Sequence, residues 1–185
     1  MSQVKEKTNK GKTFINRVAK LSAGDLAILR RCNQNPLEDQ RLFSTLGKLG
    51  ALNTYEYAIV ACLYAVYHKP DDLPRSIEKY NFGKAFRHAY DPENKKQDTR
   101  FRAILSADKG DALAYRLRQA IRLLKSKDEP VDFSVLVSDL YNWEKQDKWV
   151  QRKWAQGYYE GFLDNTDLPE DNDLEVTSDE DESEI

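Results

Sequence analysis

The apolar positions of this chain recur with the period of an α-helix in nearly every segment. The segment 113–124 is the clearest case, because one face is apolar and much of the other is cationic at about 100° per residue. Its apolar face consists of Leu113, Leu117, Ala120, Ile121 and Leu124. The segments 133–143 and 150–162 have a similar helical pattern. No segment alternates polar and apolar residues as a half-buried strand does, so we predict an all-α fold, a helical bundle.

Two kinds of local signal place the helices more closely. The stretch 53–68, "NTYEYAIVACLYAVYH", is apolar almost all round, which predicts a central buried helix. Small polar residues mark helix starts: Ser22 and Asp25 in "SAGD" form a capping box, and Asp132 follows the helix break at Pro130.

Segments without helical periodicity divide the chain. They are the polar N-terminus, the linker-like "DPENKKQD" at 91–98 and the acidic end of the chain. We therefore predict a disordered N-terminus at 1–12, an N-terminal helical lobe at 13–90, a C-terminal helical lobe at 96–163 and a disordered acidic tail at 164–185.

The net charge of −2 hides two opposed blocks. The tail at 164–185 holds eleven acidic residues and no basic one, which leaves 29 basic and 20 acidic residues in the body of the chain, a net charge of +9. A body with this charge favours an anionic partner such as nucleic acid, although a solvated cationic surface is also common.

The sequence shows no pattern for catalysis, a metal or a cofactor. Cys32 and Cys62 lie 30 residues apart without a CxxC pair, and His68 and His88 stand in unrelated segments. No glycine-rich phosphate loop is present. We therefore expect a binding or assembly protein that is not an enzyme and has no cofactor and no metal site, with both thiols reduced in the core.

No membrane contact is expected either. The N-terminus lacks the apolar core of a secretory signal, and the longest apolar run, 57–67, is too short to cross a bilayer. These features favour a cytoplasmic protein.

The basic residues occur in clusters that fit a phosphate backbone. The clusters are Arg30 and Arg31; Lys84 and Arg87; Arg100 and Arg102; Arg118, Arg122 and Lys125; and Arg152 with Lys153. Cations on rigid helices neutralise phosphates without reading bases, and no helix-turn-helix, RRM or zinc-finger pattern supplies base recognition. The tryptophans Trp143, Trp149 and Trp154 offer base stacking, but their helical spacing favours packing in the core.

Five stretches, in this order along the chain, carry a resemblance to a known family. They are "LRR" at 29–31, "NFGKAF" at 81–86, "TRFRAILSAD" at 99–108, "LRQAIRLLKSKDEPVDFSVLVSDLYNW" at 117–143 and "VQRKWAQGYY" at 150–159. The series resembles the CasB family, the small subunit of Cascade, the type I-E CRISPR surveillance complex. The resemblance covers residues 13–163 and leaves out the acidic tail.

The resemblance implies a non-catalytic, all-helical bacterial protein of antiviral defence. Two copies would lie head to tail along the complex, against the backbone subunits that carry the CRISPR RNA and against the large subunit. They would help to hold the R-loop, with the displaced strand of the target DNA on a basic surface. The positions that match the family's nucleic-acid-facing cations are Arg31, Arg100 and Arg122, with Arg30 and Lys84 beside them.

Helical geometry adds Arg118, Lys125 and Arg152 to this set, and the clusters add Arg87 and Arg102. Two alternatives stay open. One is a stand-alone, sequence-independent nucleic-acid-binding protein, and the other is a structural adaptor whose cations bind acidic protein surfaces.

Overall fold

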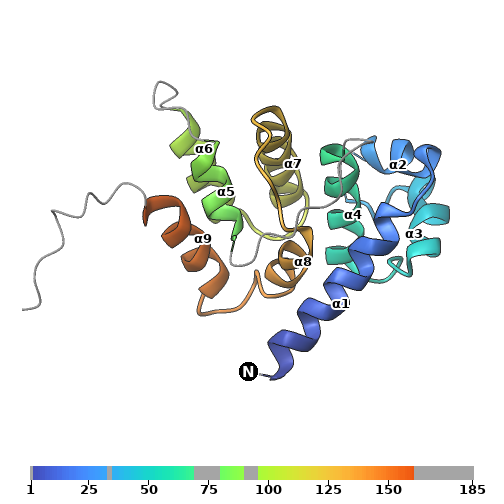
Figure 1. Ribbon diagram of the computed structural model, residues 1–185, viewed down its shortest axis with the longest axis horizontal. Helices are drawn as coiled ribbons and strands as arrows, with labels where there is room; N and C mark the ends of the chain where they lie inside the picture. Colours follow the sequence, from blue (N-terminus) through green and yellow to red (C-terminus); the bar gives the residue numbers. More distant parts are fainter. Residues whose placement is uncertain (1, 33–34, 69–79, 90–95, 161–185) are drawn as a thin grey trace, which may run out of the picture.

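A computed structural model describes residues 2–32, 35–68, 80–89 and 96–160. All regular structure in these ranges is helical, which confirms the predicted all-α fold (Figure 1). The elements are α1 (Ser2–Ala19), α2 (Ala23–Arg30), a 3₁₀ turn (Gln40–Leu42), α3 (Phe43–Leu49), α4 (Tyr55–Tyr67), α5 (Phe82–His88), α6 (Lys96–Leu105), α7 (Asp111–Ser126), α8 (Phe133–Tyr141) and α9 (Trp149–Tyr159). Within the described ranges, no helix is both long and apolar enough to span a membrane.

Helix α4 is the centre of the bundle. Ten of its thirteen residues are buried, as the nearly continuous apolar sequence predicted. It packs against α1, α2, α7 and α8, and in Figure 1 it lies between α7 and the group formed by α1, α2 and α3. Both cysteines are buried in the core as thiols, as predicted. A helix that is enclosed on several sides has no face exposed to solvent, which explains why nearly all of its residues are apolar.

The predicted helix starts are confirmed. The Ser22 side chain accepts a hydrogen bond from the Asp25 backbone N–H at the start of α2 (3.1 Å). The Asp132 carboxylate accepts bonds from the backbone N–H groups of Ser134 (2.9 Å) and Val135 (3.1 Å) at the start of α8. These side chains satisfy amides that have no partner inside their own helices.

Helices α5 and α9 approach each other closely on the side of the bundle away from α1 (Figure 1). A Cβ atom added to Gly83 would lie 1.9 Å from the backbone oxygen of Trp154, so only glycine fits there. Phe82 stacks on the Trp154 indole with ring centroids 4.5 Å apart. Trp143 and Trp154 are fully buried, which confirms that these two tryptophans pack in the core.

The N-terminal helix is longer than the sequence predicted, because the structure continues α1 back to Ser2 instead of starting it at Thr13. One tertiary contact accounts for part of the difference: a Cβ atom on Gly11 would lie 2.8 Å from the Ser134 oxygen, so α1 packs closely on α8. Sequence periodicity carries no signal of that contact.

Packing also crosses the predicted boundary between the two lobes. Helix α1 packs on α8, α4 packs on α7 and α8, α5 packs on α9, and the buried apolar residues form one cluster. Residues 91–95 of the predicted linker lie outside the described residues, and 96–98 form the first turn of α6. The tail at 164–185 also lies outside them. The division into lobes stays a prediction.

Candidate nucleic-acid interface

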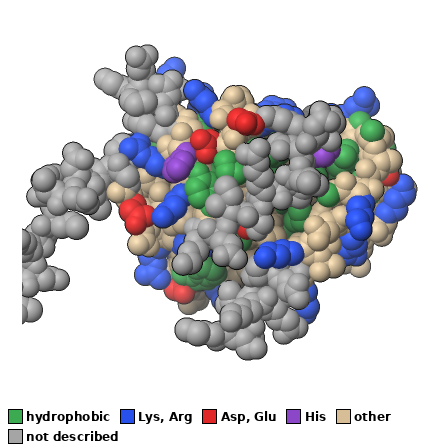
Figure 2. All heavy atoms as spheres, in the orientation of Figure 1, with side chains coloured by type: hydrophobic (Ala, Val, Ile, Leu, Met, Phe, Trp, Pro, Cys, Tyr) green, Lys and Arg blue, Asp and Glu red, His purple; other side chains and the backbone are tan. Residues whose placement is uncertain are grey.

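The structure separates the ten candidate cations into groups with different surroundings. Two of them, Arg118 and Lys125, are engaged inside the fold. Three lie around the contact between the C-terminal end of α2 and the middle of α7, one lines a groove between α6 and α7, and the others lie on α5, α6 and α9. In Figure 2, Lys and Arg side chains follow the upper rim of the molecule, over α6, α7 and α2.

Arg118 and Lys125 bind the C-terminal ends of other helices. The Arg118 guanidinium donates to the backbone oxygen of Arg30 at the end of α2. The Lys125 ammonium donates to the backbone oxygens of Val66 (3.0 Å) and His68 (3.2 Å) at the end of α4. The last carbonyl groups of a helix lack partners within it and carry partial negative charge, so cations are favourable there.

The sequence prediction that Arg118 faces solvent is therefore wrong: the residue is buried, with 8% of its surface exposed. Lys125 is partly buried. These two positions are seven residues apart, so they lie at nearly the same angle around α7, at the border of its apolar face. Their long side chains reach across that border to the neighbouring helices. Burial, and then the charge of Arg122, lowers the pKa of Arg118.

Three exposed arginines surround this junction, and we call them the α2–α7 cluster: Arg30, Arg31 and Arg122. Arg30 binds the Ala65 oxygen through Nε (2.9 Å) and keeps the rest of its guanidinium at the surface. Arg122 lies one turn beyond Arg118, about 40° further toward solvent. The cluster thus combines cations from two helices that Arg118 holds together.

Arg100 has a different environment. It lines a groove of about 320 Å³ between α5, α6 and α7, together with Tyr115, Arg116 and Gln119. Buried apolar side chains such as Phe86 and Ile104 form its inner wall. Arg116 was not among the sequence candidates. A signal was available, since Arg116 lies two residues from Arg118 and therefore about 200° away, on the opposite flank of the helix.

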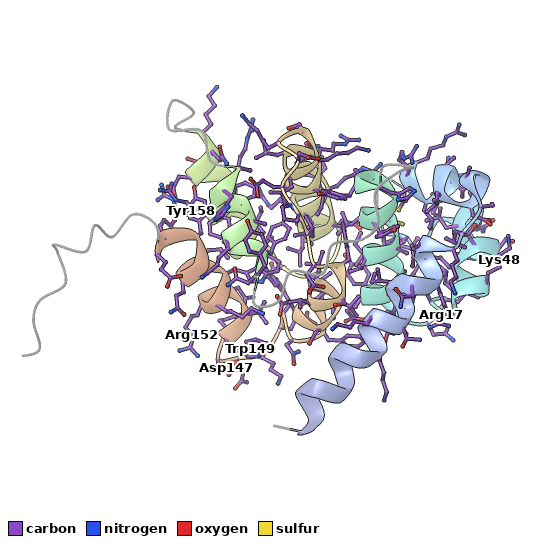
Figure 3. The ribbon with its side chains drawn as sticks, viewed as in Figure 1. Arg17, Lys48, Asp147, Trp149, Arg152 and Tyr158 are labelled. Atoms are coloured by element: carbon purple, nitrogen blue, oxygen red, sulfur yellow. The ribbon has the colours of Figure 1, made fainter. Side chains whose placement is uncertain are left out.

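The remaining candidates are spread over the far side of the bundle. Arg102 pairs with Asp98 (2.6 Å) and Lys84 pairs with Glu160 (3.2 Å). Arg87 lies partly buried on α5. Arg152 is exposed in the first turn of α9, away from α6 in Figure 3. The structure thus does not bring all ten cations onto one surface.

Lys153, next to Arg152, is engaged with a buried carboxylate. Its ammonium donates to Asp139 Oδ1 (2.7 Å), and the Trp154 indole N–H donates to Asp139 Oδ2 (2.7 Å). Burial raises the pKa of Asp139, against the effect of Lys153. This network links α8 to α9. In the described residues, no group of three or more His, Cys, Asp or Glu side chains is arranged to hold a metal ion.

Comparison with known proteins now decides the family. The sequence model of the family described as "CRISPR-associated protein Cse2" matches residues 25–159. The chain belongs to the Cse2 family. This family, also called CasB, is the small-subunit family of the type I-E Cascade complex, so the resemblance seen in the sequence is confirmed.

Individual relatives agree with this Cse2 assignment. A CRISPR-associated protein Cse2 from Thermus thermophilus is 35% identical over 101 residues, which cover 55% of this chain and 54% of that protein. The chain thus spans about half the length of that curated relative. The crystal structure of M. ruber CasB shares 29% identity over 82% of this chain and 93% of its own, with a TM-score of 0.67.

The fold also occurs in a larger assembly. A chain in a structure described as "CRISPR RNA-guided surveillance complex" has the same fold, with a TM-score of 0.65 and 20% identity, over 83% of this chain and 94% of its own.

The cations selected by the resemblance and by helical geometry have partly different surroundings. Arg31, Arg100 and Arg122, which the resemblance aligns with the family's cations, are all exposed. Of the three residues added from helical geometry alone, Arg118 and Lys125 are engaged with helix ends and Arg152 is exposed. A helical projection shows which way a Cα–Cβ bond points, but a long cationic side chain can still bend toward a neighbouring carbonyl.

Proposed function

We propose that this Cse2 chain is a non-catalytic subunit of a type I-E CRISPR surveillance complex and holds nucleic-acid backbone on a basic surface. The observation that carries the proposal is that the charges of Arg31, Arg100 and Arg122 are exposed and not neutralised within the part of the chain that the structure describes. All three are exposed, Arg100 and Arg122 on helices and Arg31 at the C-cap of α2, and no described residue forms an ion pair with any of them. Their charges are therefore available to phosphates.

The physical basis is counterion release. Each phosphate that a cation neutralises releases condensed counterions, which gives affinity without base recognition. In RNA-guided complexes, pairing with the guide supplies the sequence information, so the protein needs shape and charge. The displaced strand of the R-loop is the ligand that best fits such a surface, because it lacks a pairing partner.

The other candidates contribute less to this surface. Lys84 and Arg102 would first have to leave Glu160 and Asp98, and Arg118 and Lys125 would have to leave helix ends. Arg30 adds to the charge of the α2–α7 cluster, whereas Arg87 and Arg152 lie on α5 and α9, on the far side of the bundle. The family assignment supports the protein partners of the proposal: the backbone subunits with their CRISPR RNA, the large subunit and a second copy of this chain.

A double variant tests the proposal. Arg100→Ala with Arg122→Ala should weaken binding of the full-length chain to a single-stranded oligonucleotide of random sequence. The slope of log K against log salt should fall in magnitude by about 0.7 for each lost phosphate contact, hence by about 1.4 for two. The measurement is a fluorescence-anisotropy titration repeated from low to moderate salt.

The matched control is Arg17→Ala with Lys20→Ala, which removes the same charge from the C-terminal end of α1; Figure 3 labels Arg17. It should lower affinity only through long-range charge, and this effect should fade as salt screens it. Equal affinities and slopes for the two double variants would reject a localised interface. Association with Cascade subunits that survives nuclease treatment and the loss of both arginines would favour the adaptor alternative.

A further inference from the structure

The groove between α6 and α7 has a lining that generic phosphate binding does not require. Tyr115 is the most exposed large hydrophobic residue among those described, with 59% of its surface accessible. It lines the same groove as Arg100 and Arg116. An exposed aromatic ring costs apolar hydration in the free protein, so its position beside two cations points to a ligand with an aromatic part and a negative charge.

Helical spacing places these groups together. Tyr115, Arg116 and Gln119 belong to successive turns on one side of α7, and Arg100 approaches from α6. None of the eight residues that line the groove is acidic. The apolar inner wall, to which Phe86 and Ile104 belong, can take the face or edge of a base, and the two arginines that line the groove are exposed.

The size of the groove limits its occupant. About 320 Å³ is near the low end of the range for small-ligand pockets, about 300–1,000 Å³. One nucleotide unit fits this volume, whereas a base pair within a duplex does not present a free base face to it. The lining therefore suits an unpaired nucleotide.

We propose that this groove binds one nucleotide of a single strand, with the base against the Tyr115 ring and its phosphate between Arg100 and Arg116. Gln119 supplies an amide that can bond the base edge without selecting one base. The inference rests on the proposed function and deepens it, because it adds a contact with the base to a surface that otherwise binds only phosphates. That contact makes the surface selective for unpaired strands.

The experiment separates the base contact from the phosphate contacts. The full-length chain is titrated with a thymidine oligonucleotide and with a strand of equal length and charge that contains abasic units. We expect the base-bearing strand to bind at least about five-fold tighter, the low end for one stacked base. Tyr115→Leu should abolish this preference and leave the salt slope unchanged, because no phosphate contact is lost.

Three further variants give the result its controls. Tyr115→Phe keeps the ring and should keep the preference. Arg116→Gln should lower the salt slope by about 0.7 on both strands, because it removes a phosphate contact from either. Tyr141→Leu removes another exposed tyrosine, on α8, and should leave the preference intact.

Several outcomes would overturn the inference. The first is an equal affinity of the unmodified chain for the two strands, and the second is a preference that survives Tyr115→Leu. A third is a thymidine monophosphate that binds as tightly as the oligonucleotide, since the groove would then take a free nucleotide and not a unit of a strand. Each of these results leaves the proposed function intact if Arg100→Ala with Arg122→Ala still lowers the salt slope. If that double variant has no effect, the proposed function fails first.

Discussion

Two arginines one turn apart on α7 should respond to mutation in opposite ways. Arg118 is buried and bonds the end of α2, whereas Arg122 is exposed and faces solvent. Replacing Arg118 with alanine should therefore lower the stability of the chain. Replacing Arg122 with alanine should spare stability and weaken nucleic-acid binding.

The size of the Arg118 effect follows from opposing contributions. The lost hydrogen bond from a charged donor to the Arg30 oxygen contributes about 1.5–3 kcal/mol. Against this, the Nε atom of Arg118 is buried without a partner among the described residues, and its removal regains about 1 kcal/mol. The net loss is about 0.5–2 kcal/mol. For a chain of this length, this loss lowers Tm by about 1–8 °C.

Two further variants, Arg122→Ala and Arg118→Met, are compared with Arg118→Ala. Arg122→Ala should change the free energy of unfolding by no more than about 0.5 kcal/mol, the usual range for a surface substitution. Arg118→Met keeps the apolar stem and removes the charge together with its unpaired donor. It should therefore be more stable than Arg118→Ala, because a well-packed apolar replacement of a buried charge is often tolerated.

The assay combines thermal unfolding of the purified chain with the salt titration of single-strand binding. Arg118→Ala should melt earlier but keep the slope of log K against log salt, and Arg122→Ala should do the reverse. If the two alanine variants have the same Tm, the assignment of Arg118 to the fold is wrong. A reduced slope for Arg118→Ala at unchanged Tm would place its charge at the nucleic acid instead.

Two further predictions concern the contacts of α9 with α5 and with α8. Gly83→Ala should destabilise the chain by about 3 kcal/mol or more, because its Cβ would overlap the Trp154 oxygen. The control Gly24→Ala, in an open position on α2, should be neutral or stabilising by up to about 1 kcal/mol. Equal urea midpoints for the two variants would refute the close approach of α5 and α9. Burial raises the pKa of Asp139 in the folded chain above the ordinary value of about 4. As the pH rises, this carboxyl therefore ionises at a lower pH in the unfolded chain than in the folded one. The contribution of Asp139 to stability falls as the pH rises from about 4 toward the raised pKa. Urea unfolding should therefore show the advantage of the unmodified chain over Asp139→Asn shrinking across that window, and a constant difference would contradict the raised pKa.

The parts of the fold that could be predicted are those with local signals. The caps at Ser22 and Asp132 bond amides two or three residues away, so a short window of sequence contains both partners. The sequence of α4, which is apolar on all sides, likewise indicates that the helix is buried. Residues 2–12 gave no such signal, because their helix packs on α8, where Gly11 approaches Ser134 from far away in the sequence.

The candidate site was predicted less completely for the same reason. Arg31, Arg100 and Arg122, which the resemblance to the family selected, are exposed. The roles of Arg118 and Arg116 depend on which helices lie beside the two flanks of α7, and a helical projection does not contain that information. Periodicity shows on which flank of α7 a residue lies. Whether that residue stabilises the fold or stays available for binding depends on the helices packed beside it, which are α2 and α4 on one flank and α6 on the other.

Helix α7 thereby connects stability with binding. On one flank, Arg118 and Lys125 neutralise the C-terminal ends of α2 and α4 and so hold in place the helix end that carries Arg31. On the opposite flank, Arg116 faces the groove with α6. Arg122 lies one turn beyond Arg118, about 40° further toward solvent, at the surface beside the α2 junction. Replacing Arg118 or Lys125 by a neutral residue loosens the helix packing that positions the exposed cations. Replacing Arg116 or Arg122 removes one of the exposed cations itself. Both kinds of variant would weaken nucleic-acid binding in a single assay at one salt concentration, and only the pairing of Tm with salt slope separates them.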